Sequence, residues 1–157
     1  MAIRRVAEEG ISETEMIDIS EKAVVPRKAV AEGTIRLTRR SMMLLKRGAG
    51  KKGNPFPAAE IAGVGAAKKT HELIPLCHNI PLDYVRVRLR AGTDTVTARC
   101  EVAAHWKTGV EMEALTGVSV ALLTVWDMVK SSEKDASGQY PVTSIAEIRV
   151  LNKYRGR

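Results

Sequence analysis

Aromatic residues make up only 4% of this 157-residue chain, and cysteine occurs just twice. Without large rings, the core has to be built from Ala, Val, Ile, Leu and Met, and a nucleic-acid surface has no platform on which bases stack. Cys77 and Cys100 are too few for the disulfide framework of a small secreted domain. We therefore expect reduced thiols, a cytoplasmic protein and no nucleic-acid partner.

The chain also lacks a hydrophobic run of membrane-spanning length. Its longest apolar segment, residues 114–126, includes Thr, Ser and Gly, whereas a transmembrane helix needs about 20 predominantly apolar residues. This segment therefore predicts a core helix and no membrane partner. The N-terminus becomes polar within its first few residues, which predicts that no signal peptide is present.

Positive charge, by contrast, is abundant. The 25 Lys and Arg residues outnumber the 18 Asp and Glu residues, giving a net charge of +7 and a pI near 9.6. A basic surface attracts nucleic acid and any other polyphosphate. A small anionic substrate and simple solubility explain the same charge, so charge alone does not choose among the three.

The order of the predicted elements indicates an α+β sandwich, in which helices pack on one face of an antiparallel sheet. The clearest strand alternates apolar residues with arginine, so that Arg86, Arg88 and Arg90 share one face. Asn54 followed by Pro55 is a typical helix start. The predicted helices cover residues 39–47, 54–72 and 112–132, and the predicted strands cover residues 29–37, 84–90, 95–106 and 145–151.

Two glycines lie inside the helix predicted over residues 54–72. Because Gly63 and Gly65 weaken a helix, we expect this helix to pack closely against another element. The length of the chain predicts one domain. We expect residues 1–15 to form a flexible tail and residues 16–157 to form that domain.

Two carboxylates, Glu111 and Glu113, stand directly before the long apolar segment. In an extended segment they would project to the same side, where they suit a metal, acid–base chemistry or a polar substrate. Inside a helix they would diverge by about 200°. A third interpretation is that acidic residues favour a helix N-terminus through its dipole. The sequence leaves these alternatives open.

Asp127 and Lys130 lie one turn apart near the other end of the same predicted helix. An exposed pair of this kind contributes only a few tenths of a kcal/mol. Asp127 follows Glu113 by 14 residues, which is roughly 21 Å along a helix axis. Since one small substrate can hardly contact both ends within one chain, the two ends either serve different sites or belong to a site completed by a neighbouring subunit. We favour the second interpretation.

His78 is a candidate general acid or base because histidine titrates near neutral pH, although a lone histidine is more often structural. The cysteines and histidines were also considered as zinc ligands. Their spacing matches no paired-ligand motif, so we predict no metal site. The residues concerned are His71, Cys77, His78, Cys100 and His105.

The glycine-rich segment 48–54 carries Lys51 and Lys52 directly before a predicted helix. Backbone N–H groups at a helix N-terminus, together with lysines, favour a bound anion. The segment lacks the Walker A spacing, so it indicates a general anion site and not a P-loop. Lys68 and Lys69 at the far end of the helix complement its dipole.

These peptides together resemble the molybdenum cofactor biosynthesis protein C family, the cyclic pyranopterin monophosphate synthases. The resemblance covers about residues 16–152 and is most specific in Leu-Ile-Pro-Leu-Cys-His at 73–78 and Thr-Gly-Val-Glu-Met-Glu-Ala-Leu at 108–115. Further matches are Asp18-Ile-Ser, Arg27, Lys52-Gly53, residues 61–64, residues 66–70 and Asp127-Met-Val-Lys130.

The resemblance implies a ferredoxin-like fold and a hexamer made of dimers (a trimer of dimers), with active sites at subunit interfaces. It also implies a lyase whose substrate, 3′,8-cyclo-7,8-dihydroguanosine triphosphate, is made from GTP by a radical enzyme. The products are cyclic pyranopterin monophosphate and pyrophosphate. No cofactor is required, and whether Mg²⁺ accompanies the triphosphate stays open.

By the same resemblance, residues 16–157 form a catalytic domain. Its functional residues fall on Lys52, His78, Glu111, Glu113, Asp127 and Lys130, with Arg27 and Lys68 as helpers. The three cations Arg27, Lys52 and Lys68 suit the triphosphate and the departing pyrophosphate. We expect Lys130, oriented by Asp127, to transfer protons, and Lys52 is the second candidate for that role.

The remaining expected site residues bind substrate. Glu113 and His78 are expected to hold the guanine-derived part or the water that hydrolyses it, with Glu111 and Met112 beside them. Cys77 is expected to line the site by packing and not to act as a nucleophile.

Overall fold

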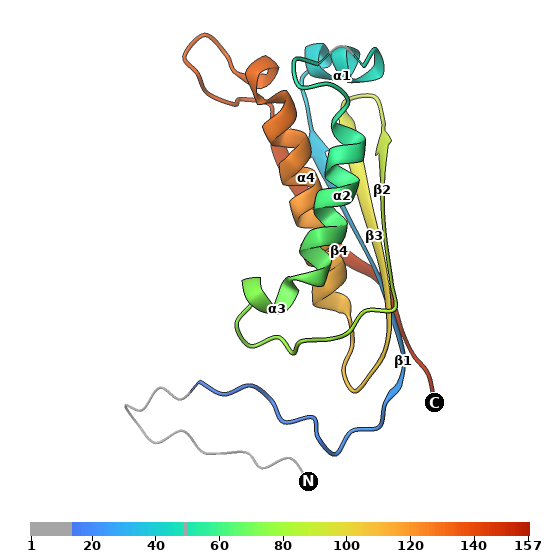
Figure 1. The fold of residues 1–157 in the computed structure, drawn as a ribbon. Coiled ribbons are helices and arrows are strands. Elements are labelled where there is room, and N and C mark those ends of the chain that lie inside the picture. Colours follow the sequence, from blue (N-terminus) through green and yellow to red (C-terminus); the bar gives the residue numbers. More distant parts are fainter. Residues whose placement is uncertain (1–13, 49) are drawn as a thin grey trace.

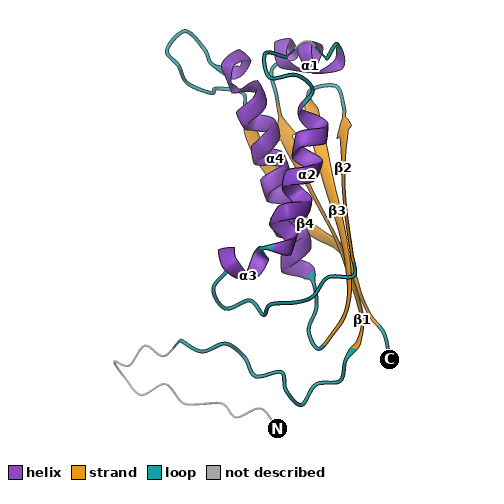
Figure 2. Cartoon of the chain, in the orientation of Figure 1, coloured by secondary structure: helices purple, strands orange, loops and turns teal. Residues whose placement is uncertain are grey.

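The computed structural model describes residues 14–48 and 50–157. They form one four-stranded antiparallel sheet in the order β2-β3-β1-β4, with helices on one face (Figures 1 and 2). Of the expected tail at residues 1–15, residues 1–13 lie outside the described part of the chain. The strands are β1 (Val25–Arg36), β2 (Tyr84–Ala91), β3 (Thr95–Trp106) and β4 (Ser144–Arg155), and the helices are α1 (Arg39–Lys46), α2 (Pro55–Lys68), α3 (Thr70–Leu73) and α4 (Glu111–Glu133).

The strand order confirms the predicted ferredoxin-like α+β sandwich. β1 and β3 occupy the centre, and helical connections on one face lead from β1 to β2 and from β3 to β4. α2 and α4 lie side by side on the sheet, as Figure 1 shows. The N-terminal end of α4 lies near α3, and its C-terminal end lies near α1.

Several element boundaries differ from those predicted. β1 begins at Val25 and β4 continues to Arg155, each further than the alternation of apolar residues indicated. The helix expected to reach residue 72 breaks at Lys69, whose backbone is not helical. The buried hydroxyl of Thr70 donates to the carbonyl oxygens of Ala66 and Ala67, so the last turn of α2 is satisfied there and α3 starts anew.

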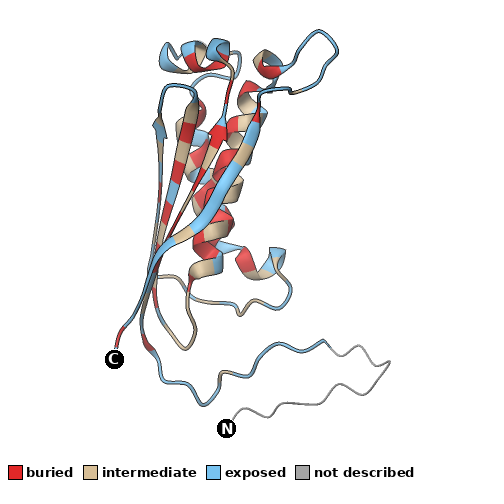
Figure 3. Cartoon of the chain, turned by 180° about the vertical axis from the view of Figure 1, so that it is seen from behind, coloured by how far each residue is buried: buried red, intermediate tan, exposed pale blue. Residues whose placement is uncertain are grey.

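The core lies between the sheet and the two long helices. Figure 3 shows the buried residues concentrated there. Strand partners on the covered face are small or branched, among them Ala31 opposite Cys100 and Ala29 opposite Val102. Small side chains let the helices approach the backbone of the sheet, so a core with few aromatic residues still buries its side chains closely.

The other face of the sheet is polar and open. Arg86, Arg88 and Arg90 point to it together, as the alternation in β2 predicted. Lys28 on β1 forms an ion pair with Glu101 on β3, with 2.5 Å between Nζ and Oε1. This face therefore carries an excess of positive charge away from the helices.

α4 is long and apolar enough to cross a membrane by length and composition alone. Half of its most apolar window is buried inside the protein, because residues such as Ala114, Val118 and Leu122 face the sheet and are fully buried. The helix thus occupies the core position predicted for it.

We expect Gly63→Ala to destabilise the fold. A Cβ at Gly63 would lie 2.8 Å from the carbonyl oxygen of Gly117 on α4 and 3.0 Å from Val87. The backbone of α4 cannot yield locally, so the free energy of unfolding should fall by about 1–3 kcal/mol, the usual cost of overpacking. Denaturant titration measures this change.

Gly65→Ala is the matched control in the same helix. A Cβ there meets nothing within 4 Å, so alanine should stabilise the helix by up to about 1 kcal/mol. The close packing predicted for the two glycines therefore holds at Gly63 and is wrong for Gly65. Equal stability of the two variants would contradict this contrast.

Candidate active site

The predicted site residues gather in two clusters, one at each end of α4. The lysine cluster consists of Lys52, Asp127 and Lys130 at the C-terminal end. The carboxylate cluster lies at the N-terminal end and consists of Arg27, Cys77, His78, Glu111, Met112, Glu113 and Lys153. No residue of one cluster contacts the other within the described chain.

Asp127 is the centre of the lysine cluster. Its two carboxylate oxygens accept hydrogen bonds from different lysines, Lys130 at 2.7 Å and Lys52 at 2.6 Å. Lys130 comes from the next turn of α4, but Lys52 comes from the loop before α2. The pair predicted along one helix is therefore part of a three-residue network that joins two elements.

The charges in this cluster support one another. Hydrogen bonds from Lys130 and Lys52 lower the pKa of Asp127 to about 2. The hydrogen bond to Asp127 in turn raises the pKa of Lys130. At neutral pH the cluster thus holds a carboxylate between two ammonium groups, with a net charge of +1 and spare N–H donors facing solvent.

The loop that carries Lys52 has a defined turn. Gly53 has a φ of 81° and donates its N–H to the carbonyl oxygen of Gly50 at 2.8 Å, a conformation that favours glycine. Asn54 then caps α2, since its side chain accepts from the N–H of Phe56 at 3.0 Å. The helix start was predicted correctly, and it places Lys52 beside the end of α4.

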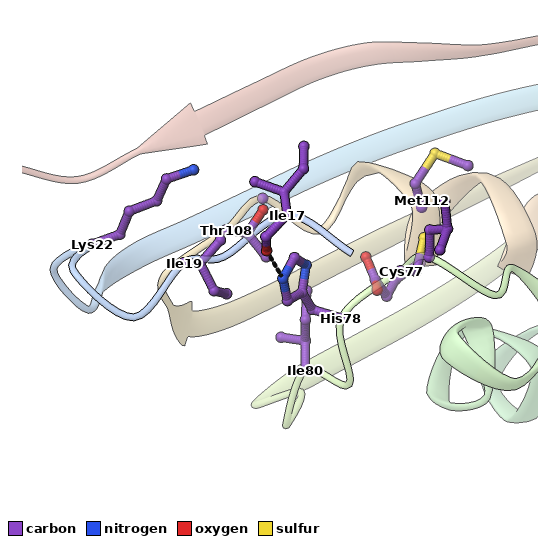
Figure 4. A pocket seen from close by; sticks show the side chains of 11 residues that line it. Ile17, Ile19, Lys22, Cys77, His78, Ile80, Thr108 and Met112 are labelled. Atoms are coloured by element: carbon purple, nitrogen blue, oxygen red, sulfur yellow. Dashed lines mark hydrogen bonds between the residues drawn. The ribbon is translucent and has the colours of Figure 1, made fainter. Parts of the chain in front are cut away.

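A cavity of about 200 Å³ opens beside the carboxylate cluster (Figure 4). His78, Cys77, Met112 and Glu113 line it, together with Ile17 and neighbouring residues of the N-terminal segment. The Nε2 atom of His78 lies 2.7 Å from the carbonyl oxygen of Ile17. The segment before β1 therefore forms one wall of this cavity.

Glu113 is the buried acid of the cavity. Its side chain is 4% exposed, and its Oε2 atom has no hydrogen-bond partner in the described structure. Burial, reinforced by the nearby charge of Glu111, raises the pKa of Glu113 to about 7. A buried carboxyl with one unpartnered oxygen and a pKa near 7 is suited to exchanging protons with a ligand.

Glu111 has a different environment, although it is only two residues away. It lies in the first turn of α4 with Glu113, so the two diverge, as expected for a helix. Lys153 on β4 donates to Glu111 at 2.8 Å. Burial raises the pKa of Glu111, but the contacts with Lys153 and the charge of Arg27 outweigh that effect, and the pKa is lowered.

Two further features lie beside Glu111. A Cβ at Gly109 would lie within 3 Å of its carboxylate, so a larger residue there would displace the Glu111 side chain. Arg27 donates from Nε to the carbonyl oxygen of Trp106 at 3.3 Å and from a terminal nitrogen to that of Lys107 at 3.2 Å. The guanidinium is thereby fixed at the end of β3, beside the start of α4.

Lys153 belongs to the site but was not predicted from the sequence. Lys68 was predicted as a site residue but belongs to neither cluster. Lys153 lies beyond the predicted end of the last strand at residue 151, and it pairs with Ala29 in the observed register. A longer strand would have placed it on the helix face. Lys68 is exposed at the C-terminal end of α2, and no polar contact of the described residues links it to the other cations.

The described residues include no group of three or more His, Cys, Asp or Glu that could hold a metal ion. Both carboxylate oxygens of Asp127 already form ion pairs with lysines. The buried Cys100 has a pKa raised to about 12 by burial and by the charge of Glu101, so it stays protonated and serves the core.

We expect Lys153→Met to raise the pKa of Glu111 above its ordinary value of 4.5. The burial of Glu111 remains in the variant, while its main charged partner is lost. NMR titration of the carboxyl carbon measures this shift. Lys28→Met, which removes the equivalent partner of Glu101 on the open face, should leave Glu111 unchanged, and a shift of equal size in both variants would contradict the assignment.

The fold and the two clusters define a small α+β enzyme with ionisable groups at both ends of one core helix. The MoaC family model matches residues 16–156, and the chain belongs to the MoaC family.

Three relatives are each called "Probable cyclic pyranopterin monophosphate synthase". The protein from Thermococcus kodakarensis is 56% identical over 154 residues, covering 98% of this chain and 97% of its own. The protein from Pyrococcus abyssi is 53% identical, covering 98% and 94%. The protein from Methanosarcina acetivorans is 57% identical over 141 residues, covering 90% and 89%.

Proposed function

We propose that this chain is a cyclic pyranopterin monophosphate synthase of molybdenum cofactor biosynthesis. It converts 3′,8-cyclo-7,8-dihydroguanosine triphosphate into cyclic pyranopterin monophosphate and pyrophosphate. The name shared by its relatives supports the reaction. The observation that carries the proposal is the pairing of a cationic cluster with a buried acid of raised pKa, both built from peptides that carry the family resemblance.

The lysine cluster acts on the triphosphate. Forming the cyclic phosphate requires a ribose hydroxyl to attack phosphorus and lose its proton while pyrophosphate departs. Lys52 and Lys130 bind the phosphate oxygens and neutralise the charge that develops on the leaving group. The raised pKa of Lys130 keeps its ammonium group protonated at neutral pH, so it meets the substrate as a proton donor and not as a base.

The carboxylate cluster acts on the purine. Rearranging a purine into a pterin requires ring opening, with protons moved on and off nitrogen and carbon. Glu113 exchanges these protons, and His78, Cys77 and Met112 hold the ring beside it. Glu111 and Arg27 set the electrostatics around Glu113. The chain's own side chains supply this chemistry, and no resident cofactor is needed.

Two copies of the chain build one complete site. The lysine cluster and Glu113 are separated by most of the length of α4, roughly 21 Å, which supports a site shared across an interface. Ile61 on α2 and Leu123 on α4 are 75% and 56% exposed, so the helical layer offers apolar surface to a partner. The assembly is a hexamer, a trimer of dimers, in the cytoplasm, and a radical GTP cyclase supplies its substrate.

Mixing two inactive variants tests the shared site. Lys130→Ala and Glu113→Gln lie at opposite ends of α4, so a mixed dimer contains one site with neither substitution. Co-refolded mixtures should recover up to about a quarter of the wild-type rate, the share expected from random pairing of subunits at a two-chain interface. Absence of any recovery, from mixtures shown by native mass spectrometry to contain hybrids, would contradict a shared site.

Turnover itself is tested by supplying freshly made cyclised triphosphate to the purified protein. Pyrophosphate and pterin should form together in a 1:1 ratio, with EDTA and Mg²⁺ arms to measure any dependence on the ion. A folded protein that forms neither product would overturn the proposed function.

The arginine row on the open face favours one alternative, a nucleic-acid-binding module. Such binding rests on phosphate contacts and weakens steeply with salt. We expect only salt-sensitive, sequence-independent RNA binding, lost in an Arg86, Arg88 and Arg90 triple alanine variant that keeps its turnover. Tight RNA binding at physiological salt would favour the alternative.

A further inference from the structure

Glu133 is a buried carboxylate at the last residue of α4. It is 2% exposed, and its position contributed nothing to the site predicted from sequence. Three donors surround it. The backbone N–H of Thr38 lies 3.1 Å from both of its oxygens, and the Thr38 hydroxyl lies 2.8 Å from Oε1. The hydroxyl of Thr143 donates to Oε2.

The two threonines belong to the segments that flank the lysine cluster. Thr38 is the N-cap of α1 and accepts from the N–H of Ser41. α1 leads directly into the loop that carries Lys52. Thr143 closes the segment that connects α4 to β4, in which Tyr140 packs edge-on against Trp126 at 5.6 Å between ring centroids. One carboxylate therefore ties α4 to both neighbours.

The chemistry of this contact favours a positional role. Burying a carboxylate is costly, and apolar residues of similar volume stabilise a core at least as well. The carboxylate fixes the positions of Thr38 and Thr143 relative to α4, since charge-assisted hydrogen bonds from three donors define one geometry. Lys130 lies one helical turn before Glu133 on α4. Lys52, in the loop after α1, forms its ion pair with Asp127 on the same helix.

We propose that Glu133 is a positioning residue for the lysine cluster: it fixes α1 and the loop after it, so that Lys52 is held against Asp127 and Lys130. The kinetic consequence rests on the proposed function. The structural consequence, the hold on the loop, is independent of it.

The decisive variants are Glu133→Leu and Glu133→Gln. Leucine keeps the volume and removes every acceptor. Glutamine keeps an acceptor oxygen for Thr38, and its NH₂ group can donate to the hydroxyl of Thr143. We therefore expect leucine to release the loop and glutamine to restore the wild-type behaviour.

The rate of limited trypsin cleavage measures how firmly the loop that carries Lys52 is held, and the measurement does not need the cyclised triphosphate. Trypsin cuts after Lys51 and Lys52, and a lysine held in an ion pair is a poor substrate. Cleavage at these two bonds should be at least about tenfold faster in Glu133→Leu and unchanged in Glu133→Gln, a tenfold change being what a loss of about 1.4 kcal/mol in closing the loop produces. Asp127→Asn, which removes the ion-pair partner of Lys52, marks the rate of a released loop.

Steady-state kinetics then test the consequence for catalysis. A displacement of about 1 Å costs roughly 100-fold in rate, so Glu133→Leu should lose that factor in kcat/KM, and Glu133→Gln should stay near the wild type. Val118→Ala in the middle of α4 is the matched control for general destabilisation, because it opens the core away from both clusters. It should change neither kcat/KM nor loop cleavage below its melting temperature.

The outcomes separate the two proposals. If wild-type protein turns over no substrate but trypsin cleavage responds as expected, the proposed function fails and the role of Glu133 stands. If the loop of Glu133→Leu is cleaved at the wild-type rate, or if Val118→Ala matches it in cleavage and kinetics, Glu133 is no positioning residue.

Discussion

Replacing Lys130 with alanine is expected to lower kcat by about 1,000-fold, within the range that a positioned general acid contributes. Lys130 is exposed and belongs to the surface network around Asp127, so the fold should survive and the circular dichroism spectrum should stay unchanged. Single-turnover measurement of pyrophosphate release separates this loss of chemistry from any loss of binding. KM should change far less than kcat.

Lys46→Ala is the matched control, since Lys46 is an exposed lysine near the end of another helix and belongs to neither cluster. It should keep wild-type kinetics. Turnover retained by Lys130→Ala would remove this lysine from the mechanism and leave Lys52 as the candidate for proton transfer. A large loss in both variants would instead indicate that overall positive charge attracts the substrate.

The alternation of β2 and the cap at Asn54 carried enough information to predict one strand and the start of one helix. Strict apolar–polar alternation has one structural solution, and an Asn-Pro pair directly before an apolar run starts a helix at a defined residue. Both features depend on neighbours in the sequence. The break at Lys69 was missed because the burial of Thr70, whose hydroxyl donates to the carbonyl oxygen of Ala67, depends on packing elsewhere in the fold.

The same distinction separates the parts of the site. Residues inside specific peptides, such as His78 and Glu113, were found because the resemblance marked them. Lys153 and Glu133 depend on partners 42 and 95 residues away, and only the sheet register or the packing of α1 on α4 brings them together. Spacing within a sequence contains no such information, and the contrast between Glu111, which pairs with Lys153, and the buried Glu113 is equally a property of the fold.

Glu113→Gln is expected to lower kcat by about 100-fold and to change how stability depends on pH. In the wild type the pKa of Glu113 is about 7 in the fold and 4.5 is its ordinary value, so the folded state keeps a proton that the unfolded chain releases. The contribution of this proton to the free energy of unfolding is fully present below about pH 4.5. It is lost as the pH rises through 7.

Glutamine stays neutral at every pH, so the variant escapes that loss. The difference in unfolding free energy, variant minus wild type, should therefore grow between pH 5 and pH 8 by about 3 kcal/mol, since each pKa unit corresponds to about 1.4 kcal/mol. In the wild type, titration of Glu113 should make kcat change with pH near pH 7. This pH dependence should disappear with the same substitution. Urea titrations at several pH values measure the first effect, and kcat measurements across the same range follow the second.

Glu101→Gln is the control, because its effect on the free energy of unfolding should depend on pH in the opposite direction. The hydrogen bond from Lys28 lowers the pKa of Glu101, so this carboxylate stabilises the fold above its ordinary pKa and loses that contribution as the pH falls. Its substitution should destabilise the protein at neutral pH and leave turnover intact. If Glu113→Gln gave a difference that does not vary with pH, Glu113 would be ionised throughout and unable to exchange protons near pH 7. The purine rearrangement would then require another acid, and His78, which lines the same cavity, is the candidate.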